Sequence, residues 1–281
     1  MRNRVYIEIT NRCNLACDFC HGTKRPLGTM PPEDFRRIAE KLRGETSYLY
    51  LHVLGEPLLH PQLKELLAIA GELGFRVCLV TNGTLLHKRR EELLAAKSLH
   101  KASVSLHSFE GNGGAGDLPA YLHQVWDVCL PLSERGVLCA LRLWNEGTAP
   151  RLNSAVEAFL SQRIGRDVES LPRDARGNRT LRPNLFLERA ERFGWPDLNA
   201  PESGANFCHG FTRQLAVLWD GTVTPCCLDS EGDIPLGNLL SQPLEEILQG
   251  ERAAAMAAGF AAQKPTEELC RRCGYARRFL K

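Results

Sequence analysis

The sequence lacks any apolar run long enough to span a bilayer, which excludes a membrane-spanning protein. It also lacks a large net charge of either sign, because 35 lysines and arginines are opposed by 33 acids, giving +2. This balance argues against a dedicated nucleic-acid binder, which would be strongly basic. The first predicted strand begins at about Val5 and leaves no room for a signal peptide, so we expect a cytoplasmic protein.

Cysteine, in contrast, is plentiful, with 11 residues among 281. In a reducing cytoplasm cysteines remain thiols, so they indicate metal ligands or redox groups rather than disulfides. A chain of this length buries roughly 75% of its unfolded surface and needs no disulfides in order to fold. Cys78, Cys129 and Cys139 lie in apolar segments and are expected to be inert buried thiols.

Up to residue 143 the chain alternates predicted strands and helices. Strands are expected at residues 5–10, 47–53, 75–80, 102–106 and 137–143. Helices are expected at residues 31–44, 61–73, 85–97 and 118–135. This alternation predicts a parallel α/β sheet with right-handed connections. Beyond it we expect a helix at 151–165, an exposed loop at 166–179 containing Arg173, Arg176 and Arg179, and a sixth strand at 181–187.

Unusual residues follow the first three predicted strands. They are Cys13, Cys17 and Cys20, then Gly55-Glu56-Pro57, then Thr81-Asn82-Gly83. In parallel α/β folds the ligand site lies at the carboxyl ends of the strands, where these residues would gather. Three thiolates can hold three corners of an iron–sulfur cube and leave one iron open for reaction. The alternative is a structural zinc loop with His21 as its fourth ligand, and the gathering of the other motifs favours a catalytic site.

A second set of cysteines lies beyond a segment rich in proline and glycine at 194–204. We therefore predict two domains, residues 1–195 and 196–281. A hairpin is expected at 215–224, with an Asp-Gly turn. The expected ligands are Cys208, Cys226, Cys270 and Cys273. We favour Cys226 over Cys227 because adjacent strand residues point to opposite faces. Four thiolates suit either a structural zinc or a [4Fe–4S] cluster.

Taken together, these motifs resemble those of radical S-adenosylmethionine (SAM) enzymes with a C-terminal SPASM/twitch auxiliary-cluster domain. The matching motifs are Cys13-x3-Cys17-x-Phe19-Cys20, Gly55-Glu56-Pro57, and Cys208-x12-Gly221-x4-Cys226 followed by Cys270-x2-Cys273. The resemblance implies a partial (β/α)6 barrel with a small C-terminal α+β domain. It also implies a catalytic [4Fe–4S] cluster on Cys13, Cys17 and Cys20, with SAM on the open iron, and an auxiliary [4Fe–4S] cluster.

The resemblance further implies a set of SAM contacts. The backbone of Gly55, Glu56 and Pro57 would hold the SAM amino group, and Phe19 would lie near the adenine. By position, Asn82 and Ser105 are candidates for polar contacts, and Arg142 for the SAM carboxylate. Relatives often carry an acid in place of His107, so its role stays open.

Relatives of this kind form a 5′-deoxyadenosyl radical that takes a hydrogen atom from an unactivated C–H bond. Our leading hypothesis is oxidation of a small polar metabolite, with the auxiliary cluster accepting an electron. His52 is the candidate proton acceptor, and Trp144 and Asn145 are expected to line the cavity. The alternatives are modification of a ribosomally made peptide or protein side chain, and a non-enzymatic zinc-stapled binding protein. The expected partner is an electron donor such as flavodoxin or ferredoxin.

Overall fold

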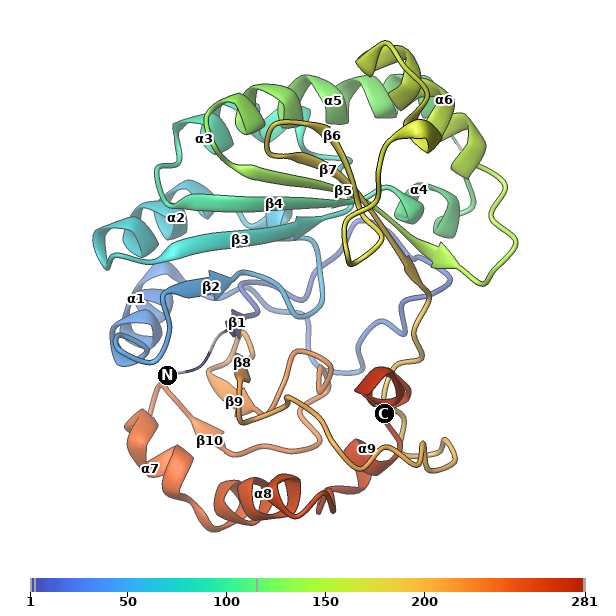
Figure 1. Cartoon of the computed structure of the whole chain (residues 1–281). Coiled ribbons are helices and arrows are strands. Elements are labelled where there is room, and N and C mark those ends of the chain that lie inside the picture. Colours follow the sequence, from blue (N-terminus) through green and yellow to red (C-terminus); the bar gives the residue numbers. More distant parts are fainter. Residues whose placement is uncertain (1, 3, 115, 280–281) are drawn as a thin grey trace.

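The computed structural model describes residues 2, 4–114 and 116–279 (Figure 1). In this part of the chain ten strands form one open sheet, in the order β10-β9-β8-β1-β2-β3-β4-β5-β7-β6. The strands are β1 Arg4–Ile7, β2 Tyr48–Tyr50, β3 Arg76–Thr81, β4 Leu99–Ser105, β5 Leu138–Glu146, β6 Arg179–Arg182, β7 Leu185–Glu191, β8 Gln214–Val217, β9 Thr222–Thr224 and β10 Gly237–Asn238. The six strands β1 to β5 and β7 are mutually parallel, which confirms the predicted partial barrel.

Helices cover the outer side of this curved sheet (Figure 1). The barrel helices are α1 Pro32–Lys41, α2 Leu63–Glu72, α3 Arg90–Ala95, α4 His107–Gly111, α5 Leu118–Glu134 and α6 Asn153–Ile164. The C-terminal helices are α7 Leu244–Gln249, α8 Glu251–Ala261 and α9 Glu268–Arg271. Within the described residues there are also four short 3-10 helices: η1 Pro57–Leu59, η2 His87–Arg89, η3 Val168–Ser170 and η4 Gly274–Phe279. None of the helices among the described residues is long and apolar enough to cross a membrane.

The two faces of the sheet differ in chemistry because successive strand residues point to opposite sides. The outer set is apolar and fully buried beneath the helices; it includes Val5, Ile7, Leu49, Val77, Val104 and Leu141. Each such side chain stabilises the fold by about 1.5–3 kcal/mol relative to exposure. The inner set is largely polar and only partly buried; it includes Tyr50, Lys101, Arg142 and Glu188. The inner face is therefore suited to contact a polar ligand.

The C-terminal segment extends the barrel sheet. Strand β8 pairs in parallel with β1 over four residues, from Arg4 opposite Gln214 to Ile7 opposite Val217. Strands β9 and β10 then add antiparallel neighbours, and β8 and β9 form the expected hairpin. The second set of cysteines is thus attached directly to the strand that leads into the first set.

Two expectations for residues 166–187 are wrong. The predicted sixth strand at 181–187 is a hairpin of β6 and β7, because the chain turns at Pro183 and Asn184, where Asn184 has a left-handed φ of 60°. Arg179 is not exposed with the loop that precedes it. It starts β6, is only 3% exposed, and pairs with Glu169 at 2.6 Å.

Candidate active site

The three N-terminal cysteines lie on the loop that follows β1. Cys13 and Cys20 are exposed and Cys17 is partly buried. Burial raises the pKa of the Cys17 thiol to about 11, and the charges of Cys13 and Cys20 add to the effect. Among the described residues no group of three or more His, Cys, Asp or Glu side chains is arranged to hold a single metal ion. Three thiols on one loop form a donor set suited to iron, and the loss of their protons would accompany iron binding.

Gly55 and Glu56 fix this loop from the end of β2. The Glu56 amide donates to the carbonyl of Arg12 at 2.8 Å, directly before Cys13. Gly55 has a φ of +74°, and a Cβ there would lie 2.4 Å from the carbonyl oxygen of Thr10. Only glycine permits this approach. The loop and the end of β2 are therefore held together through their backbones.

The carboxylate of Glu56 connects the cysteine loop and the end of β2 to the end of β3. It is buried and accepts the amide of Asn82 at 2.7 Å and that of Leu58 at 3.0 Å. Burial raises the pKa of Glu56, while these two hydrogen bonds favour the ionised form. The Gly-Glu-Pro segment thus organises the carboxyl ends of three strands, in addition to the expected contact with SAM.

Asn82 faces the cysteine loop, as expected for a residue of the site. Its Nδ2 lies 3.0 Å from Oδ1 of Asn14 and 4.0 Å from Sγ of Cys13. Its carbonyl oxygen accepts the Tyr121 hydroxyl at 2.8 Å. Asn82 is therefore immobilised beside the sulfur of Cys13.

Phe19 forms one wall of a cavity of about 310 Å³. Its ring lies 4.8 Å from that of His107, centroid to centroid. A Cβ on Gly111 would lie 2.5 Å from the Phe19 ring, so glycine is required there. Trp144 and Asn145 line the same cavity, as the sequence led us to expect, together with Arg192. His107 packs against Phe19 and bonds through Nδ1 to the carbonyl of Arg142 at 3.1 Å.

Ser105 and Arg142 face each other across β4 and β5, where they are paired in register. The Nε of Arg142 donates to Glu188 at 3.0 Å, and its guanidinium lies 4.4 Å from the centroid of the Trp144 ring. Glu188 also pairs with Lys101 at 2.8 Å. Arg142 and Lys101 together lower the pKa of Glu188 despite its burial. Sequence reasoning missed Lys101 and Glu188 as residues of the site. The only indication of them in the sequence was that both are polar residues in otherwise apolar strands.

His52 follows β2 and lies on the inner face. Its ring makes edge contacts with Tyr6 and Tyr50, at centroid distances of 5.3 and 6.0 Å. Its buried Nδ1 has no hydrogen-bond partner in the part of the chain that is described. Burial, aided by the charge of Arg142, lowers the pKa of His52 to about 3. The imidazole is therefore neutral, with a free nitrogen.

The second cysteine set flanks the β8–β9 hairpin and continues near the C-terminus. Burial raises the pKa of Cys270, and the charges of Cys208 and Cys273 act in the same direction. A Cβ on Gly210 would lie 3.7 Å from Sγ of Cys208 and 3.9 Å from Cβ of Cys226. Cys226 therefore lies beside Cys208. Cys227 packs instead against the inner-face cluster that contains Tyr6.

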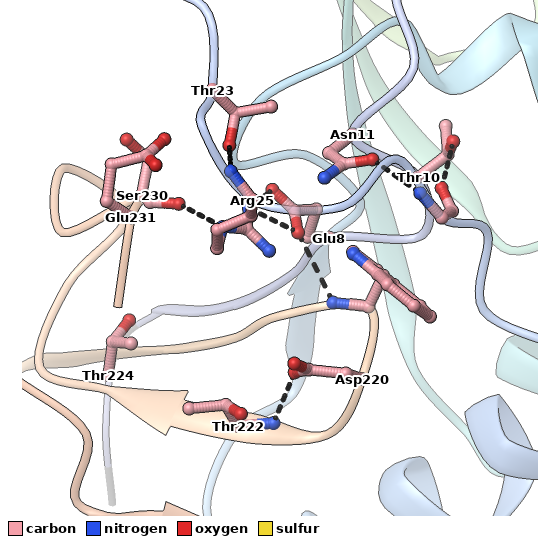
Figure 2. A network of polar contacts seen from close by, with 12 residues as sticks. Glu8, Thr10, Asn11, Thr23, Arg25, Asp220, Thr222, Thr224, Ser230 and Glu231 are labelled. Atoms are coloured by element: carbon pink, nitrogen blue, oxygen red, sulfur yellow. Dashed lines mark hydrogen bonds and ion pairs between the residues drawn. The ribbon is translucent and has the colours of Figure 1, made fainter. Parts of the chain in front are cut away.

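The two cysteine loops meet in a polar network that the sequence did not reveal (Figure 2). Arg25 contacts Glu8 with Nη2 and donates through Nε to the carbonyl of Ser230 at 2.8 Å. His21, weighed earlier as a zinc ligand, places Nε2 3.0 Å from Oγ of Ser230. The Lys24 amide donates to a carboxylate oxygen of Glu231 at 3.0 Å. The segment after Cys20 is thus bonded to the segment after Cys227.

Comparisons with known proteins match both cysteine regions. A model of the radical SAM superfamily matches residues 7–118, and a model of an iron–sulfur cluster-binding domain, SPASM, matches residues 208–274. A probable GTP 3′,8-cyclase of Methanothermobacter marburgensis is 25% identical over 84% of this chain and 87% of its own. The sporulation killing factor maturation protein SkfB of Bacillus subtilis is 27% identical over 86% of this chain and 63% of its own. The structure of BtrN with AdoMet and 2-DOIA has a TM-score of 0.60, with 19% identity over 97% of this chain and 93% of its own.

Proposed function

Because this chain belongs to the radical SAM superfamily and carries a C-terminal SPASM domain, we propose that it oxidises a C–H bond of a small polar metabolite. The observation that carries this proposal is the inner face of the barrel. There Lys101, Arg142 and Glu188 form a charged group that is only partly buried. A relative that aligns with 84% of this chain is named for a small polar substrate, GTP.

The cofactors of this enzyme are a [4Fe–4S] cluster, SAM and an auxiliary iron–sulfur cluster. When bound, they supply hydrogen-atom abstraction by a 5′-deoxyadenosyl radical and an acceptor for one electron. Family membership overturns the hypothesis of a non-enzymatic zinc protein. We propose that Cys13, Cys17 and Cys20 hold the catalytic cluster. We assign the auxiliary cluster to Cys208, Cys226, Cys270 and Cys273.

The SAM contacts proposed from the sequence are compatible with the geometry of the site. Phe19 lines the 310 Å³ cavity, where an adenine would pack against its ring. Asn82 lies beside Cys13, and Ser105 is adjacent to Arg142 on the inner face. Gly55, Glu56 and Pro57 lie next to the cysteine loop through the bond from Glu56 to Arg12. These residues would bind SAM and keep water from the reacting atoms.

We propose His52 as the proton acceptor. Its ring is neutral, and its buried Nδ1 has no hydrogen-bond partner among the described residues, so it would take a proton from a substrate bound directly against the ring on the inner face. In the proposed oxidation the substrate would give one proton to His52, and the bound cofactors would supply the acceptors for one hydrogen atom and one electron. A pKa as low as that of His52 makes its protonated form short-lived, so the proton would pass onward to solvent.

A second candidate function is modification of a ribosomally made peptide. It is favoured by the match to a maturation protein over 86% of this chain. The two functions differ in the size of the substrate that must reach the inner face. A one-electron donor protein such as flavodoxin or ferredoxin is proposed for either function, and the cytoplasm is the proposed location, since free cysteines persist in a reducing compartment.

The test is anaerobic reconstitution with iron and sulfide, reduction, and measurement of 5′-deoxyadenosine beside substrate oxidation. Replacing Cys13, Cys17 and Cys20 with alanine should abolish 5′-deoxyadenosine. Replacing Cys270 and Cys273 should leave SAM cleavage but remove the oxidised product. SAM cleavage with a panel of polar metabolites that yields no product two electrons more oxidised would contradict the proposal. A cross-linked or otherwise modified peptide would instead establish the second candidate.

A further inference from the structure

A second hollow opens on the outside of the barrel, beside the cysteine loop. It has a volume of about 270 Å³ and is lined by Leu58, Leu59, Leu85, Lys88 and Arg89. We call it the leucine groove. One wall is η1 and the other is the segment 85–89 around η2. Its lining is apolar, with two cationic side chains, and neither wall contributes to the inner face.

Arg89 makes the groove rigid by bonding one wall to the other. Its Nε donates to the carbonyl of Leu58 at 3.0 Å, and its Nη2 to the carbonyl of His60 at 2.8 Å. Its charge is balanced by Glu92, 2.9 Å away. The groove is therefore preformed, which lowers the entropic cost of binding a partner.

Each wall is bonded to a residue that flanks Cys13. On the first wall, the Leu58 amide donates to the Glu56 carboxylate at 3.0 Å, and the Glu56 amide donates to the carbonyl of Arg12 at 2.8 Å. Arg12 directly precedes Cys13. Leu58 itself is buried, and a molecule seated on the neighbouring, partly exposed Leu59 is thus separated from this cysteine by one hydrogen-bonded segment.

The second wall reaches Cys13 from its other side. Leu85 follows Thr84, whose hydroxyl accepts Nδ2 of Asn14 at 2.8 Å. Asn14 directly follows Cys13, and both Asn14 and Cys13 contact the Asn82 side chain. The groove is therefore the outer surface of the scaffold that holds this ligand of the catalytic cluster.

The exposed charge at the groove is positive. Lys88 is exposed and, in residues 2, 4–114 and 116–279, takes part in no ion pair. Arg12 is likewise exposed beside Cys13, and its Nη2 donates to the carbonyl of Leu27 at 3.2 Å. These two cations remain available to attract the acidic surface of a partner protein. At moderate salt this attraction acts over a screening length of about 10 Å.

We propose that the leucine groove is the docking site of an acidic one-electron donor protein that reduces the catalytic cluster. The proposal rests on the proposed function, since a cluster on Cys13 is what requires the electron. In this step the donor loses one electron and the cluster gains one, with no bond made or broken. Electron-transfer complexes are small and charge-complementary, which suits a shallow leucine surface bordered by Lys88.

The test compares two reductants on the reconstituted full chain, with 5′-deoxyadenosine as one readout and the flavodoxin dissociation constant, measured by isothermal titration calorimetry, as the other. Lys88→Glu should weaken flavodoxin binding and Lys264→Glu should not. Reduced flavodoxin, an acidic one-electron donor, needs a docking site, whereas dithionite does not. Lys88→Glu should slow the flavodoxin-driven rate about tenfold, and higher salt should shrink the difference. The dithionite-driven rate should stay at the wild-type value, which also reports that the variant is folded. Lys88→Arg should restore the flavodoxin-driven rate.

Lys264→Glu is the matched control, because Lys264 is exposed on the segment between α8 and α9. Equal effects of Lys88→Glu and Lys264→Glu on the flavodoxin-driven rate would overturn the docking site. So would an equal loss of the dithionite-driven rate in Lys88→Glu. The proposed oxidation is judged separately, by the presence of oxidised product in the dithionite reaction. If Lys88→Glu slows the flavodoxin-driven rate but no oxidised product forms, only the proposed function is contradicted.

Discussion

Arg25 and Glu8 form a buried ion pair that closes the first cysteine loop, at the point where this loop meets the C-terminal segment. Nη2 of Arg25 lies 2.7 and 2.8 Å from the two carboxylate oxygens of Glu8, whose side chain is fully buried (Figure 2). The amide of Trp219, from the C-terminal segment, donates to the same carboxylate at 3.3 Å. Glu8 follows β1, Arg25 follows Cys20, and Ser230 accepts a hydrogen bond from Arg25. The hydrogen bonds that Arg25 and Glu8 make to Ser230 and Trp219 therefore join the first cysteine loop to the C-terminal segment.

Breaking this pair should be costly. Replacing one member of a buried pair leaves the other charge without compensation, at a cost of about 3–5 kcal/mol. We expect Glu8→Gln to lower the free energy of unfolding by an amount of this order, measured by urea denaturation under anaerobic conditions. The control is Arg36→Gln, which removes the exposed pair of Arg36 with Glu72 at 2.6 Å. Exposed pairs contribute little, so the midpoint of this control should stay near wild type. Similar midpoints for the two variants would show that the buried pair does not hold the first cysteine loop closed.

The sequence predicted the parallel sheet and the gathering of motifs at its strand ends, because both follow from local patterns. Gly55-Glu56-Pro57 is an example, because this motif directly follows a predicted strand and was therefore expected at the strand-end site. The bond from Arg25 to Ser230 had no such signal, since it joins residues 205 positions apart. The hairpin at Asn184 was missed for a different reason. Leucines 181, 185 and 187 are compatible with one continuous strand, and a left-handed asparagine does not alter that pattern.

Cys226 and Cys227 should differ in their effect on the auxiliary cluster. Cys226 lies beside Cys208, whereas Cys227 packs near Tyr6 on the inner face. In a protein whose three N-terminal cysteines are alanine, only the auxiliary set remains to bind a cluster. There, Cys226→Ala should remove most of the iron and sulfide, and Cys227→Ala should retain them, as measured by chemical analysis and electron paramagnetic resonance. The reverse pattern would assign Cys227 as the ligand.

Glu56→Gln should disturb the catalytic loop although the change is small. The carboxylate accepts two backbone amides, from Leu58 and Asn82. An amide side chain has only one oxygen, so one of these donors would face another N–H group. Hydrogen bonds to a charged group contribute about 1.5–3 kcal/mol each. We expect a lower iron content and slower SAM cleavage at the N-terminal site.

The auxiliary cluster gives the internal control for this variant, because its ligands lie on another part of the chain. Its spectroscopic signal should be unchanged in Glu56→Gln. Loss of both clusters together would indicate general unfolding and contradict a local role for Glu56.

His52 should make the protein less stable in mild acid. Its pKa is about 3 in the folded protein, lowered by burial and by Arg142, against an ordinary value of 6.5. Below about pH 6.5 the unfolded imidazole binds a proton that the folded one does not, so the free energy of unfolding falls with pH. The loss from this group between about pH 7 and about pH 5 is about 2 kcal/mol. His52→Gln removes the titrating group. Between about pH 7 and about pH 5 the free energy of unfolding of this variant should therefore fall by about 2 kcal/mol less than that of the wild type, as measured by urea denaturation followed by circular dichroism. Equal slopes for variant and wild type would mean that His52 is protonated in the folded state, and a protonated ring is unable to accept the substrate proton.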